Sequence, residues 1–180
     1  VKTSPVHFYS KSNIHKEPYG NVLIISPWNY PFSLSFVPLI GAMAAGNTAV
    51  LKPSEMTPHS SKLMKEMLGE YFPLEYIAVI EGEAETTQNL IKANFDYVFF
   101  TGSTEVGRSV MKTASETLTP VTLELGGKSP TIVAEDADLV KAAVRIAWGK
   151  AVNAGQTCIA PDYVLVHESV KNRFIVLLQQ

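Results

Sequence analysis

Short apolar runs of strand length alternate with longer amphipathic stretches along most of the chain. The runs predict buried strands at 22–25, 48–51, 76–80, 97–100 and 121–123. The stretches between them predict helices from Pro31 to Gly46, from a Thr57 cap with Pro58 in the first turn, around 86–92, and after Gly102. Strands that are apolar throughout and alternate with helices indicate a parallel sheet covered on both faces, and therefore an α/β fold.

After Lys128 the alternation begins again, with a strand at 131–133, a helix at 137–152, a strand at 163–166 and a helix at 169–180. Spacing predicts apolar helix faces made by Leu63, Met64, Met67 and Leu68, and by Leu139, Val140, Ala143, Val144 and Ala147. We therefore expect a first α/β domain over residues 1–124 and the beginning of a second over residues 125–180. Because the chain starts at Val1 and stops inside an amphipathic pattern, we expect it to be part of a longer protein.

Ligands of parallel α/β sheets bind beyond the carboxyl ends of the strands. Polar or glycine-rich segments of this chain directly follow expected strands, at 26–29, 52–55, 102–107 and 124–128. We expect these segments to lie along one edge of the sheet. Their agreement in position carries more weight than any single motif.

The segment Gly102–Gly107 follows a strand and opens a helix. The N–H groups and the positive dipole end at such a helix start suit an anion such as a pyrophosphate. The segment is close to a P-loop, but Arg108 stands where that pattern needs Lys, and Thr104 replaces the middle glycine of the usual dinucleotide fingerprint. A tight turn without a ligand is the alternative.

Lys52-Pro53-Ser54-Glu55 ends the second expected strand. Its lysine and glutamate suit the two hydroxyls of an adenosine ribose, which an acidic residue binds in other dinucleotide folds. An ordinary polar turn explains the same residues.

Asn29 lies between Pro27 and Pro31, and the prolines restrict the backbone that carries its amide. A fixed asparagine N–H can stabilise a developing oxyanion. The alternative is a rigid helix start with Trp28 packed in the core.

Cys158 is the only cysteine of the sequence, and it follows small and polar residues. Glu124 lies upstream, beside Gly126 and Gly127, where the backbone can approach a ligand. A thiol, a carboxylate and a glycine turn are the parts that covalent catalysis through a thioester requires. A lone cysteine is otherwise commonly an inert small apolar residue.

Composition narrows the classes of function. The 17 acidic and 15 basic residues give a net charge of −2 without a basic stripe, so we expect no nucleic-acid partner. A single cysteine cannot form an intrachain disulfide, and no signal peptide is recognisable, so a cytoplasmic location is expected. Residues 20–51 carry no charge, but their prolines and asparagines favour core elements over a membrane span. The scattered histidines predict no metal site.

Taken together, Pro27-Trp28-Asn29, Lys52–Glu55, Phe100–Gly107, Glu124–Lys128 and Gly155–Cys158 resemble the aldehyde dehydrogenase superfamily, in the same order and over nearly the whole chain from about Gly20. The resemblance implies that Cys158 is the nucleophile and Glu124 the general base. The amide of Asn29 and the backbone N–H of Cys158 would form the oxyanion hole.

The same resemblance implies a variant Rossmann domain for NAD, with NADP also accepted, followed by the start of a catalytic domain. Lys52 and Glu55 would hold the adenosine ribose, and Ser54 between them would also contact the cofactor. The remaining implied cofactor contacts are Gly102, Ser103 and Gly107 at the pyrophosphate, with Trp28 and Leu125 bordering the cofactor. The expected reaction oxidises an aldehyde to an acid through a thiohemiacetal and a thioester.

Family members are more than twice as long, and their nicotinamide-ribose motif and subunit-pairing segment come later than this chain extends. We therefore expect a homo-oligomeric parent, and no turnover of aldehydes by the 180-residue chain alone. A non-catalytic nucleotide-binding fragment, or a relative that acts on acyl-CoA or semialdehyde substrates, is the alternative.

Overall fold

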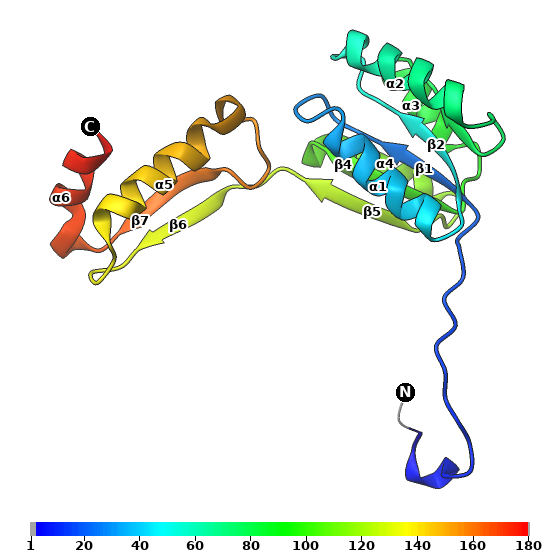
Figure 1. Cartoon of the computed structure of the whole chain (residues 1–180), viewed down its shortest axis with the longest axis horizontal. Coiled ribbons are helices and arrows are strands. Elements are labelled where there is room, and N and C mark those ends of the chain that lie inside the picture. The colour runs from blue at the N-terminus through cyan, green and yellow to red at the C-terminus, as the bar shows by residue number, and fades with distance from the viewer. Residues whose placement is uncertain (1–2, 180) are drawn as a thin grey trace.

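The structure, a computed structural model, describes residues 3–179, and within them the strands form a five-stranded and a two-stranded parallel sheet (Figure 1). The larger sheet has the order β3-β2-β1-β4-β5, and the smaller pairs β6 with β7. The strands are β1 (Asn21–Ile25), β2 (Thr48–Lys52), β3 (Ile77–Val79), β4 (Tyr97–Gly102), β5 (Val121–Leu125), β6 (Ser129–Val133) and β7 (Pro161–Val166). The predicted α/β fold, a parallel sheet flanked by helices, is confirmed.

Helices cover both faces of the larger sheet. They are α1 (Ser33–Ala44), α2 (Pro58–Tyr71), α3 (Ala84–Ile91) and α4 (Thr104–Ser115). Leu39 of α1 and Met64 of α2 share an apolar core with Ile24, whereas Val110 of α4 packs in a separate core with Leu23. Because neighbouring residues of β1 point to opposite faces, both cores need apolar residues there, which explains the unbroken apolar run of this strand.

The smaller sheet is covered on one face by α5 (Leu139–Ala151) and α6 (Glu168–Leu178). Val133, Leu139 and Phe174 are buried together in this layer. Side chains on the other face of the sheet are exposed, namely Ile132, Tyr163 and Leu165. Only residues 126–128 connect β5 to β6, so the two sheets are joined by a short link (Figure 1). The division into two domains at residues 124 and 125 stays a prediction.

The uncharged stretch 20–51 folds as β1, α1 and β2, as the core interpretation predicted. Among residues 3–179, the helices are too short or too polar to traverse a lipid bilayer.

Two expected helix faces are wrong in part. Leu63 is exposed, while Met64 and Leu68 of the same helix are buried. Val140, Val144 and Ala147 of α5 are exposed, while Leu139 and Ala143 are buried. Apolar residues continue around both helices, and spacing alone does not show which arc of a helix contacts the sheet.

Several expected helix boundaries also differ by a few residues. The first helix begins at Ser33 rather than Pro31. The helix expected at 137–152 begins only after Asp138, because the Asp138 carboxylate accepts a hydrogen bond from the Lys141 N–H and caps the helix. The helix expected at 169–180 is α6, and its expected last residue, Gln180, lies outside the described residues.

Candidate active site

The candidate segments lie at one edge of the larger sheet, because β1, β2, β4 and β5 are parallel and end where those segments begin. The chain order of the strands reverses between β1 and β4, which are neighbours in the sheet. The crevice outside such a reversal point is the usual ligand site of open parallel sheets. The topology therefore gathers the predicted segments around one crevice.

Adjacent pockets occupy this crevice. The first, of about 290 Å³, is lined by Asn29, Glu124 and Cys158 among others. The second, of about 250 Å³, is lined by Lys52 and Glu55 among others. Both pockets share the lining residues Pro27, Trp28, Thr101, Gly102 and Ser103, so they adjoin each other, and we call them together the cleft.

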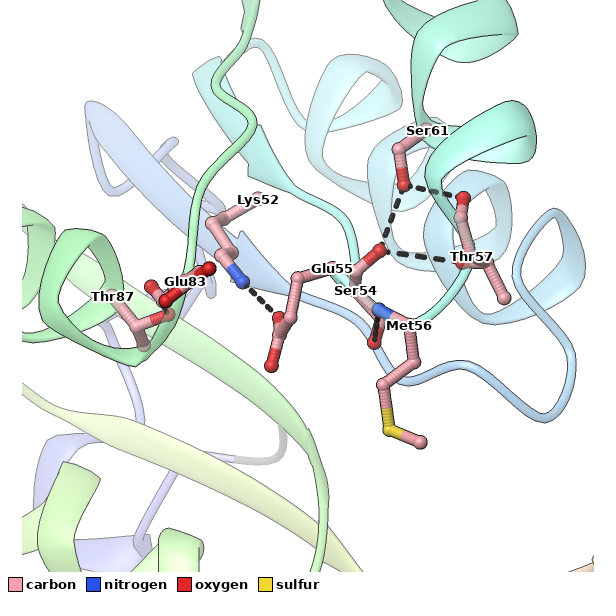
Figure 2. Close-up of polar contacts among 8 residues, drawn as sticks. All are labelled: Lys52, Ser54, Glu55, Met56, Thr57, Ser61, Glu83 and Thr87. Atoms are coloured by element: carbon pink, nitrogen blue, oxygen red, sulfur yellow. Dashed lines mark hydrogen bonds and ion pairs between the residues drawn. The ribbon is translucent and has the colours of Figure 1, made fainter.

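At the far end of the cleft, the Lys52 ammonium forms an ion pair with Glu55, with 2.7 Å between Nζ and Oε2 (Figure 2). The Lys52 side chain is only 3% exposed, whereas that of Glu55 is 45% exposed. Burial alone would raise the pKa of Glu55, but the hydrogen bond and charge of Lys52, with a backbone N–H, outweigh it and lower the pKa below its ordinary value. Glu55 is therefore an ionised acceptor at neutral pH.

Ser54 organises the turn between Lys52 and α2 (Figure 2). Its hydroxyl accepts a hydrogen bond from the Met56 N–H at 3.2 Å, and its carbonyl accepts one from the Ser61 hydroxyl at 2.9 Å. Ser54 also lines the second pocket. These bonds hold the turn so that Glu55 faces Lys52.

The start of α4 lies where the two pockets meet. Ser103 caps the helix by accepting a hydrogen bond from the Val106 N–H at 3.2 Å. Gly107 is buried, and a Cβ there would lie 2.7 Å from Leu125 Cδ2. The missing side chain lets α4 approach β5 closely, which brings the positive end of the helix to the cleft. The cleft thus offers an anion-binding helix start beside a ribose-type acceptor, and this donor set fits a dinucleotide.

Cys158 is exposed on the loop between a 3₁₀ turn (Val152–Gly155) and β7. The link between the sheets approaches this loop closely, since a Cβ on Gly127 would lie 3.1 Å from the Cys158 carbonyl oxygen. Glu124 is the residue before the last of β5, and its side chain is exposed. The Glu124 carboxylate is therefore open to water.

Asn29 connects the loop after β1 to the Cys158 loop. Its side-chain N–H donates to the Gln156 carbonyl at 2.8 Å. The Asn153 side chain donates to the Asn29 carbonyl at 2.8 Å, and the Tyr30 hydroxyl bonds the Thr157 hydroxyl at 2.7 Å. Residues far apart in the sequence thus fix the oxyanion candidate against the nucleophile candidate.

The alternative placement of Trp28 in the core is wrong. Its side chain is 39% exposed, and it lines both pockets. The indole is placed where it could border a flat ring in the cleft, and its role beside a cofactor stays a prediction.

Every predicted site residue lies in or beside the cleft. Asn29, Glu124 and Cys158 share the first pocket with Trp28, Gly102, Ser103 and Leu125. Gly107 lies against Leu125, and Lys52, Ser54 and Glu55 lie in the second pocket. The roles of these residues stay predictions. Among residues 3–179, no three His, Cys, Asp or Glu side chains are grouped as a metal site requires.

The sequence interpretation missed Tyr30, Asn153, Gln156 and Thr157. The Asn153-Ala154-Gly155 run carried one usable signal, because Asn and Gly tolerate left-handed backbone and mark tight turns. The sequence carried no such signal for Tyr30, Gln156 or Thr157, because their contacts depend on how the two sheets lie against each other.

The crevice brings the N-terminal end of α4, the Cys158 side chain and the Asn29 amide to one pocket. Residues 2–180 match the model of the aldehyde dehydrogenase family, and the chain belongs to that family.

A 4,4'-diaponeurosporen-aldehyde dehydrogenase of Staphylococcus aureus is 61% identical over 180 residues, which are 100% of this chain and 39% of that protein. A mouse aldehyde dehydrogenase described as dimeric and NADP-preferring is 50% identical, over 93% of this chain and 37% of its own length. The substrate-bound structure of Staphylococcus aureus AldH has a TM-score of 0.94 and 59% identity, and covers 99% of this chain and 39% of its own. The chain therefore spans well under half the length of the relatives it matches.

Proposed function

We propose that this segment acts within a longer enzyme that oxidises an aldehyde to a carboxylic acid with NAD(P). The main observation behind this proposal is that Cys158, Glu124 and Asn29 line one pocket, and that this pocket adjoins the one lined by Lys52 and Glu55. Membership of the aldehyde dehydrogenase family supports this chemistry.

The chain's own residues account for the covalent steps. The Cys158 thiolate attacks the aldehyde carbon, and the carbonyl electron pair moves onto oxygen. The Asn29 N–H that is not bound to Gln156, with the backbone N–H of Cys158, donates to this oxyanion. NAD(P), which Lys52, Glu55 and the N-terminal end of α4 would hold, would supply the acceptor for the hydride that leaves the former aldehyde carbon. As that C–H bond breaks and the C=O bond re-forms, an acyl thioester would remain on Cys158.

Glu124 completes the cycle in this proposal. Its carboxylate takes a proton from a water molecule as the water oxygen attacks the thioester carbon. The C–S bond then breaks, which releases the carboxylic acid and restores the thiolate. Since the Glu124 side chain is exposed here, water reaches it directly.

For the cofactor we propose a preference for NAD, with NADP accepted. The ionised Glu55 carboxylate suits a ribose hydroxyl and repels a phosphate at the same position. The mouse relative named as NADP-preferring shows that this family includes the other choice. That relative is also named as dimeric, which supports a homo-oligomeric enzyme here. A cytoplasmic location is proposed on the cysteine content alone.

The test is covalent labelling by an activated ester such as p-nitrophenyl acetate, because acylation needs no cofactor. Mass spectrometry should find the acyl group on the peptide that contains Cys158, and Cys158→Ala should abolish it. Acylation of the Cys158→Ala protein at an unchanged rate would overturn the nucleophile assignment. Tight NAD(P) binding without any acylation would favour the alternative, a nucleotide-binding function without catalysis.

A further inference from the structure

The turn that precedes the Cys158 loop has an uncommon backbone. Asn153 (φ 50°), Ala154 (φ 55°) and Gly155 (φ 77°) are consecutive left-handed residues. Glycine adopts this region freely and asparagine tolerates it, but alanine is strained there. Such a conformation persists only where its surroundings determine it, and the contacts of Asn153 identify those surroundings.

The Asn153 amide closes a ring of hydrogen bonds across the cleft. Its Nδ2 donates to the Asn29 carbonyl at 2.8 Å and, more weakly, to the Gln156 carbonyl at 3.5 Å. The Asn29 Nδ2 donates to the same Gln156 carbonyl at 2.8 Å. Asn153 therefore holds the backbone of Asn29 and also the carbonyl to which the Asn29 side chain is bound.

We propose that Asn153 is a positioning residue that aims the Asn29 amide at the oxyanion formed on Cys158. The inference rests on the proposed function, in which Asn29 donates to that oxyanion. A primary amide has two N–H groups, and the Gln156 carbonyl accepts one of them. The direction of the other is then set by the ring, so loss of Asn153 leaves the oxyanion donor free to turn away.

A second contact holds the two loops together independently of Asn153, so the orientation of the Asn29 amide can be tested separately. The Tyr30 and Thr157 hydroxyls are 2.7 Å apart and join the same two loops without Asn153. Removing the Asn153 side chain should therefore leave the loops together while loosening the Asn29 amide. Misplacement by about 1 Å can reduce a rate by about a hundredfold, so looseness of this kind is measurable.

The substitution that isolates this role is Asn153→Gly. Glycine keeps the left-handed backbone without strain and removes both side-chain hydrogen bonds. Asn94→Gly is the matched control, because Asn94 has φ 59° and lies in the exposed turn between α3 and β4. The longer enzyme and its variants would be acylated with p-nitrophenyl acetate, and the reaction followed over a range of ester concentrations.

We expect Asn153→Gly to lower the saturating acylation rate by about ten- to a hundredfold, somewhat less than complete loss of an oxyanion donor. The half-saturating ester concentration and the dissociation constant of NAD should stay unchanged. Asn94→Gly should match the wild type in every measurement.

A double-mutant cycle with Asn29→Ala decides how Asn153 acts. If it acts through Asn29, Asn153→Gly should cause little further loss once Asn29 is Ala. The positioning role would be overturned if the two substitutions reduced the acylation rate by factors that multiply in the double variant. It would also be overturned if Asn153→Gly were acylated as fast as the wild type while Asn29→Ala was slow. If Asn29→Ala itself leaves acylation unchanged, the oxyanion assignment of the proposed function has failed instead.

Discussion

Replacing Lys52 by Met tests the adenosine end of the cleft. The change removes an ammonium group from a side chain that is 3% exposed, but keeps most of its apolar stem. The lost partner is the Glu55 carboxylate, 2.7 Å away and 45% exposed. We expect the substitution to weaken cofactor binding far more than it weakens the fold.

The expected loss of stability is small because opposing terms cancel. One charge-assisted hydrogen bond is worth about 1.5–3 kcal/mol. Methionine, however, avoids the desolvation of a buried ammonium, and the carboxylate left without its partner is 45% exposed rather than buried. Since water can hydrate the half-exposed Glu55, we expect the free energy of unfolding to change by no more than about 1 kcal/mol.

In the binding free energy of the cofactor, no opposing term of this kind offsets the loss of the ammonium group. If the Lys52 ammonium donates to a ribose hydroxyl, the same loss of about 1.5–3 kcal/mol appears undiminished in the binding free energy. The dissociation constant of NAD should then rise by about ten- to a hundredfold. Titration calorimetry of wild type and variant measures this change, beside urea unfolding of both.

The stability difference should also depend on pH. Burial would raise the pKa of Glu55, but Lys52 outweighs it, so the folded-state pKa lies below that of the unfolded chain. Such a group stabilises the fold above its unfolded pKa and loses that contribution as the pH falls through the folded pKa. In acid, the wild type should therefore lose the contribution of the Lys52–Glu55 pair to its free energy of unfolding, and its stability relative to Lys52→Met should fall. Urea unfolding of both proteins at neutral and acid pH measures this change.

Lys65→Met is the matched control, because Lys65 of α2 forms an ion pair with Glu81 at 3.2 Å, and both side chains are exposed and lie outside the second pocket. It should leave the dissociation constant of NAD unchanged. An unchanged constant for a folded Lys52→Met protein, or equal losses in both variants, would refute the assignment of Lys52 to the cofactor.

Further predictions concern the other end of the cleft and the chain as a whole. Glu124→Gln should slow thioester hydrolysis while a pre-steady-state burst of reduced cofactor persists, and absence of the burst would move Glu124 to an earlier step. NAD should bind more tightly than NADP because Glu55 is ionised, and equal dissociation constants would contradict this. The 180-residue chain alone should not oxidise aldehydes, since the Cys158 loop and Glu124 are exposed and catalysis needs closely held groups. Aldehyde-dependent formation of reduced cofactor by a preparation of confirmed mass would refute that expectation.

Much of the fold could be predicted because local chemistry determines it. The strands at 22–25 and 97–100 are apolar throughout, and both are central in the larger sheet, where each face contacts helices. The common position of the polar segments at one edge of the sheet could be predicted from parallel pairing alone. The exposed arcs of α2 and α5 could not be predicted, because they depend on which neighbours cover a helix.

The site was predictable as a set of residues but not as a geometry. Asn29, Glu124 and Cys158 carry recognisable chemistry, and their places at strand ends and loops follow from the pattern of elements. The ring through Asn153 and Gln156 joins loops from different sheets, and its amide and carbonyl groups look like ordinary turn residues in the sequence. Contacts of that kind are decided by tertiary packing rather than by local preference.

The hydrogen bonds between the Asn29 loop and the Cys158 loop also connect the two halves of the cleft thermodynamically. Trp28 borders the proposed cofactor and is followed directly by Asn29, which is bound to Gln156 beside the nucleophile. A ligand that orders one loop therefore lowers the entropy cost of ordering the other. Linkage between binding free energies is reciprocal. If bound NAD lowers the dissociation constant of a reversible adduct on Cys158 by some factor, that adduct lowers the dissociation constant of NAD by the same factor. Affinity measured at either end of the cleft thus reports on the other.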